Sequence, residues 1–422
     1  MANLSTLNGV NDIRIYKNFQ EWTTPGTYTW VVPANVTRVR AIAIGGGGAG
    51  GASPDANYYG GDGGCGGGFA MGEYTVTPGQ SITVTVGAFG RTPQQRGWPD
   101  GTGENGGSSS FGAFCTGTGG GGAGWRNNNG KTRTPGTASG GTLVNATGGT
   151  GGHGAVSSWG WSTEKYPGGG GGSAGSWLGT GGNGGNMNTA NGAQTVNSPG
   201  GGGIGGAGGS AEHPNQNTSN YWMVGGGGGG SAEGGGYGYY AENYPTQSGF
   251  GGRGILAPRV SPTIQHHQGA IQGHNQGSYG PMEQWGREIH EGVAVNNYNI
   301  KGISASGGVM ASTAFATPRL LTTVGSGGAG GGGFSWVAYY AGGNGAAGGG
   351  GGGSQSFNYG TGNSGNGGFM GGGAGATNEN MYAGNGGIGG GGGGAGSMHS
   401  WQAWTTHYSG QGGTGYVTVE WA

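Results

Sequence analysis

Residues 38–51 read RVRAIAIGGGGAGG, so a run of alternating apolar residues passes directly into almost pure glycine. The alternation predicts a β-strand. A glycine-rich turn after a strand also suggests a phosphate-binding loop. Such a loop requires a helix directly after it, and a Walker loop requires Gly-Lys-Ser/Thr. Here ASPDANYYGGDGGCGGG follows, with no lysine and no helical apolar period. The sequence therefore disfavours nucleotide binding, and the glycine needs another explanation.

The composition favours a folded chain with an unusual architecture. Of 422 residues, 123 are glycine, 10% are aromatic and only 7% are charged. Glycine without a strict Gly-X-Y period, accompanied by only 15 prolines, argues against collagen. Disordered chains of low complexity usually combine many charges with few aromatics. This chain shows the reverse, so we expect its glycine segments to be ordered.

The charge pattern excludes several classes of partner. The formal net charge is −1, and the densest basic patch holds only Arg126, Lys131 and Arg133. That is too little to neutralise nucleic acid phosphates, so we expect no nucleic acid partner. The N-terminus lacks the apolar region of a signal peptide. The apolar run at residues 334–341 is too short to span a bilayer. We expect synthesis in the cytoplasm and no membrane insertion.

Three blocks of the sequence have the pattern of β-strands. The first is residues 26–44, which Pro33-Ala34-Asn35 divides into two strands. The second is residues 73–86, with two alternating strands around a Thr-Pro-Gly-Gln turn. The third is the C-terminal stretch, residues 413–422. Strands at both ends of the chain predict an all-β fold, in which a small β-sandwich is closed by N- and C-terminal strands and almost no α-helix occurs.

The glycine segments between these blocks repeat every three residues. The repeat is visible in six places: residues 59–65, 147–153, 180–186, 204–210, 363–369 and 385–388. A period of three indicates a left-handed extended helix with three residues per turn, which makes no hydrogen bonds within itself. Two glycines per turn allow neighbouring helices to exchange backbone hydrogen bonds, while the third edge displays the remaining residue. We therefore expect an ordered bundle of polyglycine II helices.

The glycine content makes this expectation demanding. Ordering glycine costs roughly 0.5–1 kcal/mol more than ordering alanine. Dense backbone hydrogen bonding, at about 0.5–1.5 kcal/mol net for each bond, could offset such a sum. We expect either nearly complete pairing of these amides or disorder. Uninterrupted runs such as residues 225–230 and 348–353 suit the centre of a bundle.

The residues that could carry chemistry do not form a recognisable site. His266, His267 and His274 have no cysteine or carboxylate at metal-ligand spacing. Three glutamates could supply paired carboxylates for glycan hydrolysis, but their separation is not encoded in sequence: Glu283, Glu288 and Glu291. We expect no enzyme activity, no catalytic residue, no cofactor and no metal. The two cysteines could form one disulfide, although free buried thiols are favoured: Cys65 and Cys115.

Aromatic residues occur mostly at the breaks between glycine blocks. Loops rich in Tyr, Trp, Ser, Gly and Asn have the composition of a recognition surface. The alternative is that these aromatics form the core because aliphatic residues are scarce, and we expect this for Trp30 and Trp421. The candidates for such a recognition surface are Trp159, Trp161, Trp177, Tyr221, Trp222, Tyr237, Tyr239, Tyr240, Trp401 and Trp404.

Four stretches resemble, in order, the glycine-rich module of bacteriophage tail fibres and other virion structural proteins. They are TYTWVVPANVTRVRAIAIGGGGAGG, GGGFAMGEYTVTPGQSITVTVGAFG, GGSSSFGAFCTGTGGGG and GGTGYVTVEWA. The glycine runs with aromatic breaks also resemble tail-tip adhesins of large phages, in which polyglycine helices present host-specific loops. The resemblance implies a virion protein made in the host cytoplasm. Its partners would be a host cell-surface protein or glycan, other virion proteins, and copies of itself, with a trimer favoured.

Two functions from different classes follow. The first is a tail fibre or tail-tip adhesin that binds a host receptor through aromatic and polar loops. The second is a purely structural fibre, decoration or filament protein. An ice-binding polyglycine bundle is disfavoured because no one-residue ladder persists in the sequence.

The expected organisation has six segments. They are a virion-attachment or assembly segment (1–20), a β-sandwich framework with the first glycine loops (21–116), a polyglycine bundle with aromatic loops (117–254), a glycine-poor insertion (255–324), a second polyglycine bundle segment (325–412) and a closing strand (413–422).

Overall fold

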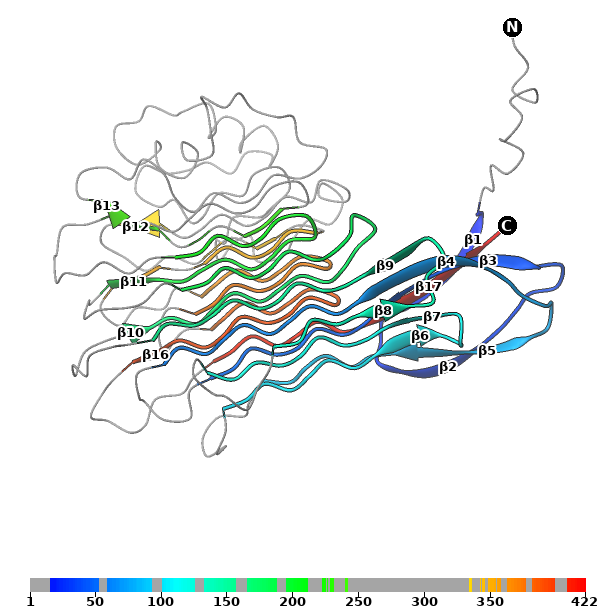
Figure 1. Cartoon of the computed structure of the whole chain (residues 1–422), viewed down its shortest axis with the longest axis horizontal. Helices are drawn as coiled ribbons and strands as arrows, with labels where there is room; N and C mark the ends of the chain where they lie inside the picture. The colour runs from blue at the N-terminus through cyan, green and yellow to red at the C-terminus, as the bar shows by residue number, and fades with distance from the viewer. Residues whose placement is uncertain are drawn as a thin grey trace, which may run out of the picture.

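The fold is elongated, with a β-sandwich at one end and a bundle of extended glycine-rich chains at the other (Figure 1). A computed structural model describes residues 16–52, 59–92, 101–125, 133–156, 165–187, 195–211, 222–224, 226, 228–230, 240–241, 334–335, 342, 344–345, 348–353, 355–357, 363–376, 382–398 and 408–422. Within these residues every regular element is a β-strand. The described part contains no helix long and apolar enough to cross a membrane.

The sandwich consists of two antiparallel sheets of five strands each. The first has the order β1-β17-β3-β4-β9. Its strands are β1 (Asn18–Trp22), β17 (Tyr416–Trp421), β3 (Arg38–Ile44), β4 (Phe69–Thr75) and β9 (Val144–Ala146). The second has the order β2-β5-β6-β7-β8. Its strands are β2 (Gly26–Val31), β5 (Ser81–Val86), β6 (Ser109–Phe111), β7 (Cys115–Gly117) and β8 (Ala138–Ser139).

The C-terminal closing strand was predicted correctly, whereas β1 was not among the predicted strands. β17 lies between β1 and β3, so strands from both ends of the chain sit side by side in one sheet. The expected all-β sandwich is confirmed, as are the two strands in residues 26–44 and the two around the Thr-Pro-Gly-Gln turn. Strand β9 belongs to the first sheet and strand β8 to the second, although both lie beyond residue 116, where the sequence suggested that the framework ends.

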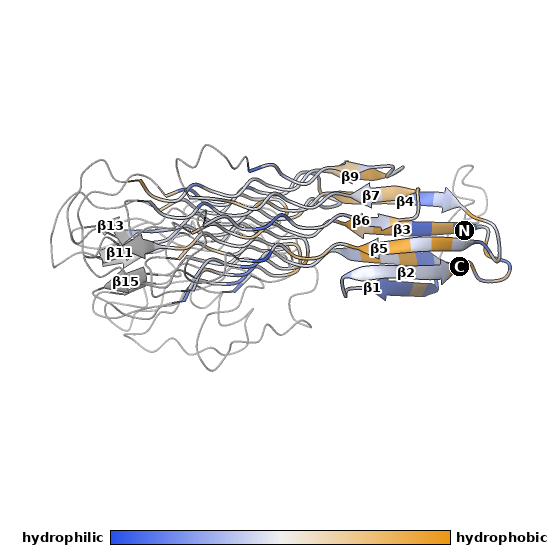
Figure 2. Ribbon diagram, turned by 90° about the horizontal axis from the view of Figure 1, so that it is seen from below, coloured by the Kyte–Doolittle hydropathy of each residue, from blue (hydrophilic) through white to orange (hydrophobic). Residues whose placement is uncertain are grey.

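The core of the sandwich forms because the inward-facing residues of both sheets are apolar. Val84 of β5 and Val419 of β17 are fully buried, as their alternation predicts. Trp30 packs its ring against Trp421 at 5.4 Å and against Phe111 at 5.7 Å between centroids. Figure 2 shows that hydrophobic residues concentrate in these strands, whereas the chains of the bundle are close to neutral in hydropathy. Burial of side chains therefore stabilises the sandwich, and another interaction must stabilise the bundle.

That interaction is backbone hydrogen bonding with a rotation of three residues. In segment 45–52, the amides of Gly45, Gly48 and Gly51 donate to one neighbouring segment. The amide directly after each of these donates to a second segment, and the next amide along the chain donates to a third. The acceptors lie in residues 62–68, 101–107 and 410–413. In a β-strand successive amides alternate between two sides. A rotation through three neighbours is the pattern that a helix of three residues per turn predicts.

The carbonyl groups of the same segment complete its surroundings. They accept hydrogen bonds from amides of three further places in the chain: Gly90, residues 120–123 and residues 392–395. Segment 45–52 therefore has six hydrogen-bonded neighbours, and every residue in it is buried. The strand that ends in glycine leads into the interior of the bundle. The polyglycine II helix, as a defined conformation, stays a prediction that we return to below.

Glycine is required in the bundle because neighbouring backbones touch where a side chain would begin. A Cβ atom on Gly48 would lie closer than 3.0 Å to the carbonyl oxygen of Gly121, and one on Gly394 would meet the carbonyl of Gly61 in the same way. Real Cβ atoms essentially never approach so closely. The glycines thus allow the close backbone approach that their hydrogen bonds need.

The residues between the glycine pairs do not all mark the boundary of the bundle. In the repeat of residues 59–65, Asp62 and Cys65 are buried, with relative exposures of 8% and 0%. In the repeat of residues 180–186, by contrast, Asn183 and Asn186 are exposed. The expectation that the third residue is always displayed is therefore wrong for the first repeat, because that chain has neighbours on every side.

Short strand pairs close the bundle at the end away from the sandwich (Figures 1 and 2). One pair is β10 (Lys165–Tyr166) with β16 (Ser397–Met398). A second is β11 (Thr195–Asn197) with β15 (Gln355–Phe357). A three-stranded sheet has the order β13-β12-β14, formed by Tyr240–Ala241, Trp222–Val224 and Phe334–Ser335. We call this end of the molecule the distal end.

Candidate functional site

The described residues of the distal end border several of the aromatic-rich segments of the sequence. Val156, which forms a bridge with Tyr59, and Lys165, in β10, lie on either side of the predicted loop that contains Trp159 and Trp161. Met398, in β16, precedes the predicted loop that contains Trp401 and Trp404. The aromatic-rich segments therefore begin and end at the distal end, while β1 and the C-terminus lie at the sandwich (Figure 1).

One face of the bundle is built from parallel chains in register. Gly345 donates to the carbonyl of Asn366, Gly367 to that of Asn385, and Gly386 to that of Gln411. This register brings four amide side chains into one row, with Asn344 at its edge. The N–H of Asn366 donates to Oδ1 of Asn344 at 2.8 Å, that of Asn385 to Oδ1 of Asn366 at 2.8 Å, and that of Gln411 to Oδ1 of Asn385 at 2.9 Å. We call Asn344, Asn366, Asn385 and Gln411 the amide row.

The amide row solves a problem of the bundle surface. Each outermost chain lacks a neighbour on one side, so one amide in three has no backbone acceptor. The asparagine side chain of the adjacent chain accepts that bond instead. The same kind of hydrogen bond appears on another face of the bundle. There the backbone N–H of Thr150 donates to Oδ1 of Asn183 at 2.9 Å, and the backbone N–H of His153 donates to Oδ1 of Asn186 at 2.8 Å. The repeated Gly-Gly-Asn pattern was the signal in the sequence, but its capping role was missed.

A stacked pair of tyrosines lies on the same face as the amide row, three residues further from the sandwich along each chain. The rings of Tyr382 and Tyr408 have centroids 4.1 Å apart and an interplanar angle of 26°. Tyr382 is 52% exposed, and its N–H donates to Oδ1 of Asn363 at 3.4 Å. A hydrogen bond between the two phenols, followed by their electrostatic interaction, raises the pKa of Tyr382. Neither tyrosine was a predicted site residue, because only the register of two separate chains of the bundle brings them together.

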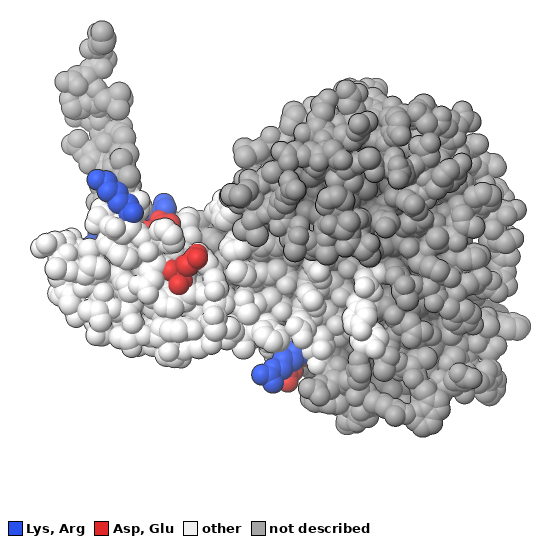
Figure 3. Space-filling model, turned by 180° about the vertical axis from the view of Figure 1, so that it is seen from behind, with Lys and Arg blue, Asp and Glu red and all other residues white. Residues whose placement is uncertain are grey.

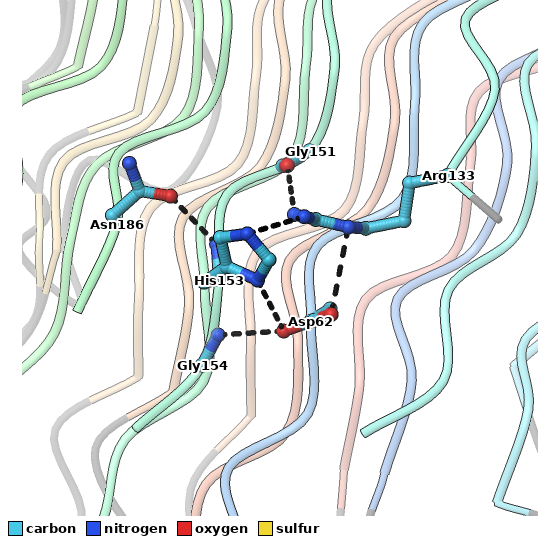
Figure 4. A network of polar contacts seen from close by, with 6 residues as sticks. All are labelled: Asp62, Arg133, Gly151, His153, Gly154 and Asn186. Carbon is cyan, nitrogen blue, oxygen red and sulfur yellow. Dashed lines mark hydrogen bonds and ion pairs between the residues drawn. The ribbon is translucent and has the colours of Figure 1, made fainter. Parts of the chain in front are cut away.

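A second polar group is embedded between chains of the bundle (Figure 4). Gly154 N–H donates to Oδ1 of Asp62 at 2.8 Å, and Nε of Arg133 lies 3.5 Å from the other carboxylate oxygen. The Asp62 and Arg133 side chains are only 11% and 15% exposed. His153 completes the group, with Nδ1 3.6 Å from Oδ1 of Asp62 and Nε2 2.6 Å from Nη2 of Arg133. Guanidinium only donates, so Nε2 of His153 accepts and its proton lies on Nδ1, toward the carboxylate.

A buried thiol, Cys65, lies in the same chain as Asp62. Burial is the largest influence on Cys65 and raises its pKa to about 11, against smaller opposing effects of a backbone hydrogen bond with Gly151 and of the charge of Arg133. A nucleophilic cysteine requires a lowered pKa. The contacts of Asp62, Arg133 and His153 fit an internal ion pair that holds three chains together.

Comparison with known proteins places the chain in a family. The profile of a family described as a glycine-rich domain matches residues 23–261, more than half of the chain. The chain belongs to the glycine-rich domain family. No curated protein matches it. The matched part of this glycine-rich domain begins after β1 and ends before β17, so the closing strands of the sandwich lie outside it.

The predicted receptor contacts are distributed unequally over the chain. Trp177 is 54% exposed and lies at the sandwich end of the bundle, where its ring packs edge-on against Phe69 at 6.4 Å. Trp222 and Tyr240 belong to β12 and β13 at the distal end, which pair through Met223 and Tyr240. The structure therefore separates Trp177 from the other two. The remaining candidates lie outside the described residues: Trp159, Trp161, Tyr221, Tyr237, Tyr239, Trp401 and Trp404.

The other predicted chemical residues have simple outcomes. Cys65 and Cys115 are free and buried, as favoured. The histidines and glutamates of segment 255–324 lie outside the described residues. Among the residues that the structure does describe, no three His, Cys, Asp or Glu side chains gather closely enough to hold a metal ion. On the face in Figure 3, charged side chains of the described residues form only small groups on an otherwise uncharged surface.

Proposed function

We propose that this protein is a non-enzymatic phage virion protein, a tail fibre or tail-tip adhesin that binds a host surface receptor through distal loops. The observation that carries the proposal is the polarity of the molecule. The sandwich holds β1 and the C-terminal strand β17, and the strands β10 and β16, which border aromatic-rich segments of the sequence, lie at the opposite end. A protein attached through its sandwich would present that opposite end outward.

The bundle supports the proposal as a rigid platform. Recognition loops are most effective when a stiff scaffold positions them, because little ordering remains to be done on binding. Segment 45–52, in the interior of the bundle, is held by backbone hydrogen bonds along its whole length. The sequences between the chains supply Trp159, Trp161, Trp401 and Trp404, a composition suited to rigid aromatic contacts.

The experiment is a binding assay with the purified full chain and a panel of intact bacterial strains. We expect saturable binding to some strains, and loss of binding when Trp401 and Trp404 are both changed to alanine. Phe19→Ala is the matched control, since Phe19 is 67% exposed on β1 of the sandwich, far from the distal end. A folded protein that binds no strain, or a double variant that binds as well as the unchanged chain, would contradict the proposal.

A second candidate is a structural virion protein that assembles with itself or with other virion proteins. The outer face of the first sheet favours it, because Ile42, Met71, Val144 and Tyr416 are only partly buried there. Exposed Phe369 packs edge-on against Tyr416 and adds to this apolar face. Apolar residues on the outer face of an antiparallel sheet suit a subunit contact. Sedimentation velocity tests it: a trimer that Met71→Glu dissociates supports assembly through this face, and a monomeric full chain excludes it.

A further inference from the structure

The parallel face of the bundle carries two rows of side chains of complementary chemistry. The first is the amide row, whose members Asn366, Asn385 and Gln411 are exposed. The second lies one three-residue period closer to the distal end and contains Asn363, Tyr382 and Tyr408. The backbone fixes both rows, because Ser364 donates to the carbonyl of Tyr382 and Ala383 donates to that of Tyr408. The face is therefore pre-organised.

The amide row keeps donors for a ligand. An asparagine side chain has two N–H donors in addition to its carbonyl oxygen. In Asn366 and Asn385 the carbonyl oxygen accepts from the neighbouring chain, at 2.8 and 2.9 Å. This bond fixes the side-chain plane and leaves the amide N–H groups on an exposed residue. The row thus holds a set of aligned donors on a fixed backbone.

The tyrosine pair supplies an apolar surface beside those donors. Tyr408 covers one face of the Tyr382 ring, yet Tyr382 keeps 52% of its surface exposed. In the row, Tyr382 lies between Tyr408 and Asn363, whose shorter side chain accepts the Tyr382 N–H. We call this arrangement of the exposed Tyr382 ring beside the asparagine amides the step.

We propose that this step, formed by Tyr382, Asn363 and the adjacent amide row, is a binding site for the glycan chains of a cell surface. A pyranose ring presents C–H groups on one side, which pack against an aromatic ring, and hydroxyl oxygens at its rim, which accept hydrogen bonds from amides. None of the described residues that form the two rows is charged, which suits a neutral saccharide. The inference rests on the proposed host-recognition function and gives it a ligand class and a site outside the predicted tryptophans.

A structural role for the same residues makes a different prediction. If the tyrosine pair only stabilises the contact between two chains of the bundle, Tyr382→Ala would lower the free energy of unfolding and leave saccharide binding intact. If the pair is a binding wall, the variant would lose binding at nearly unchanged stability, because Tyr382 is largely exposed. Tyr382→Phe keeps the ring and removes the hydroxyl, so it should retain binding in the second case.

The test is a titration of the isotope-labelled full chain, followed through the side-chain amide signals of Asn363 and Asn366. The probes are chitohexaose, maltohexaose and the polysaccharide released from any strain that the protein binds, each at millimolar concentration. We expect at least one probe to shift these signals, and Tyr382→Ala to weaken that binding about tenfold, as loss of a central aromatic contact does. Phe19→Ala should bind as the unchanged chain does.

Two results would overturn the inference. One is the absence of any shift at Asn363 and Asn366 with every probe. The other is an affinity of folded Tyr382→Ala equal to that of the unchanged chain. If Tyr382→Ala bound cells as strongly as the unchanged chain, this site would be refuted and the proposed adhesin function would be unaffected. If the unchanged chain bound no cells, the proposed adhesin function itself would be refuted.

Discussion

The backbone N–H of Asn385 donates to Oδ1 of Asn366 at 2.8 Å, so a side chain of one chain takes the place of a missing neighbour for the next. Asn366→Ala removes this acceptor. We expect water to replace it, because both residues are exposed, and the free energy of unfolding to fall by only about 0.5–1.5 kcal/mol. Amide exchange at Asn385 should become faster. Gln411→Ala is the control, since no described amide donates to the Gln411 side chain. If amide exchange at Asn385 became as fast in Gln411→Ala as in Asn366→Ala, the capping role would be contradicted.

The interior of the bundle should tolerate no side chain at all. A Cβ atom on Gly66 would lie closer than 3.0 Å to the carbonyl oxygen of Ser173, which is backbone and cannot rotate away. We expect Gly66→Ala to lower the free energy of unfolding by at least about 3 kcal/mol, measured by urea denaturation. Gly79→Asn is the control, because Gly79 has a φ of 79° in a turn with nothing within 4 Å of its Cβ position. Asparagine tolerates this conformation. Equal midpoints for the two variants would show that the bundle does not constrain stability.

The ion pair inside the bundle should be strongly coupled. Arg133→Met leaves the Asp62 carboxylate, 11% exposed, without its cation, and we expect a loss of about 3 kcal/mol. Asp62→Asn combined with Arg133→Met should recover much of this loss, since the neutral amide oxygen can still accept from Gly154. A double-mutant cycle by urea denaturation measures the coupling. Additive effects of the two changes would refute a coupled pair.

The buried thiol of Cys65 predicts a pH dependence of stability. Burial raises the pKa of this thiol from 9.0 to about 11, so the folded state holds the proton more tightly than the unfolded state does. The stability that results is fully present below pH 9.0 and is lost as the pH rises toward 11. By the upper end of this window the unfolding free energy should have fallen by about 2 kcal/mol.

Cys65→Ala isolates this effect from the tyrosines, which also ionise in alkali. Urea denaturation at increasing pH should show a smaller decline for Cys65→Ala than for the unchanged chain. The thiol should also resist alkylation in the folded protein and react after unfolding. Rapid alkylation under native conditions would contradict the burial.

The hydrogen bonds of segment 45–52 predict slow amide exchange. Gly48 N–H donates to the carbonyl of Cys65 at 2.9 Å inside six neighbouring chains, so its exchange requires opening of the bundle. We expect these glycines to exchange more slowly than the amides of β1, an edge strand. Backbone chemical shifts should place them near φ of about −75° and ψ of about +145°, the polyglycine II conformation. Fast exchange, or dihedral angles of a flat β-strand, would end the polyglycine helix prediction.

Much of the fold was predictable because its signals are local. Where apolar and polar residues alternate, as in Arg38–Ile44 and Tyr416–Trp421, the pattern defined strands that the structure confirms. The candidate site was less predictable. Trp177 was chosen with the other aromatics but lies at the sandwich end, and the Tyr382–Tyr408 pair was not chosen at all. Aromatic composition marks the breaks between chains and does not reveal at which end of the bundle each break falls.

The order of residues along the chain is enough to separate the part that packs through side chains from the part that packs through backbone. It specifies the apolar strands of the sandwich, the three-residue rotation of the glycine segments, and the asparagines available to cap their surface. Which chains become neighbours emerges only in three dimensions, and this explains why Asp62 is buried while Asn183 is exposed at an equivalent repeat position. Glycine chains pair through backbone groups that are the same at every residue, so the local pattern does not distinguish one partner from another. Their register is set by the sandwich that anchors them and by the turns between them, which are long-range relationships that no local pattern encodes.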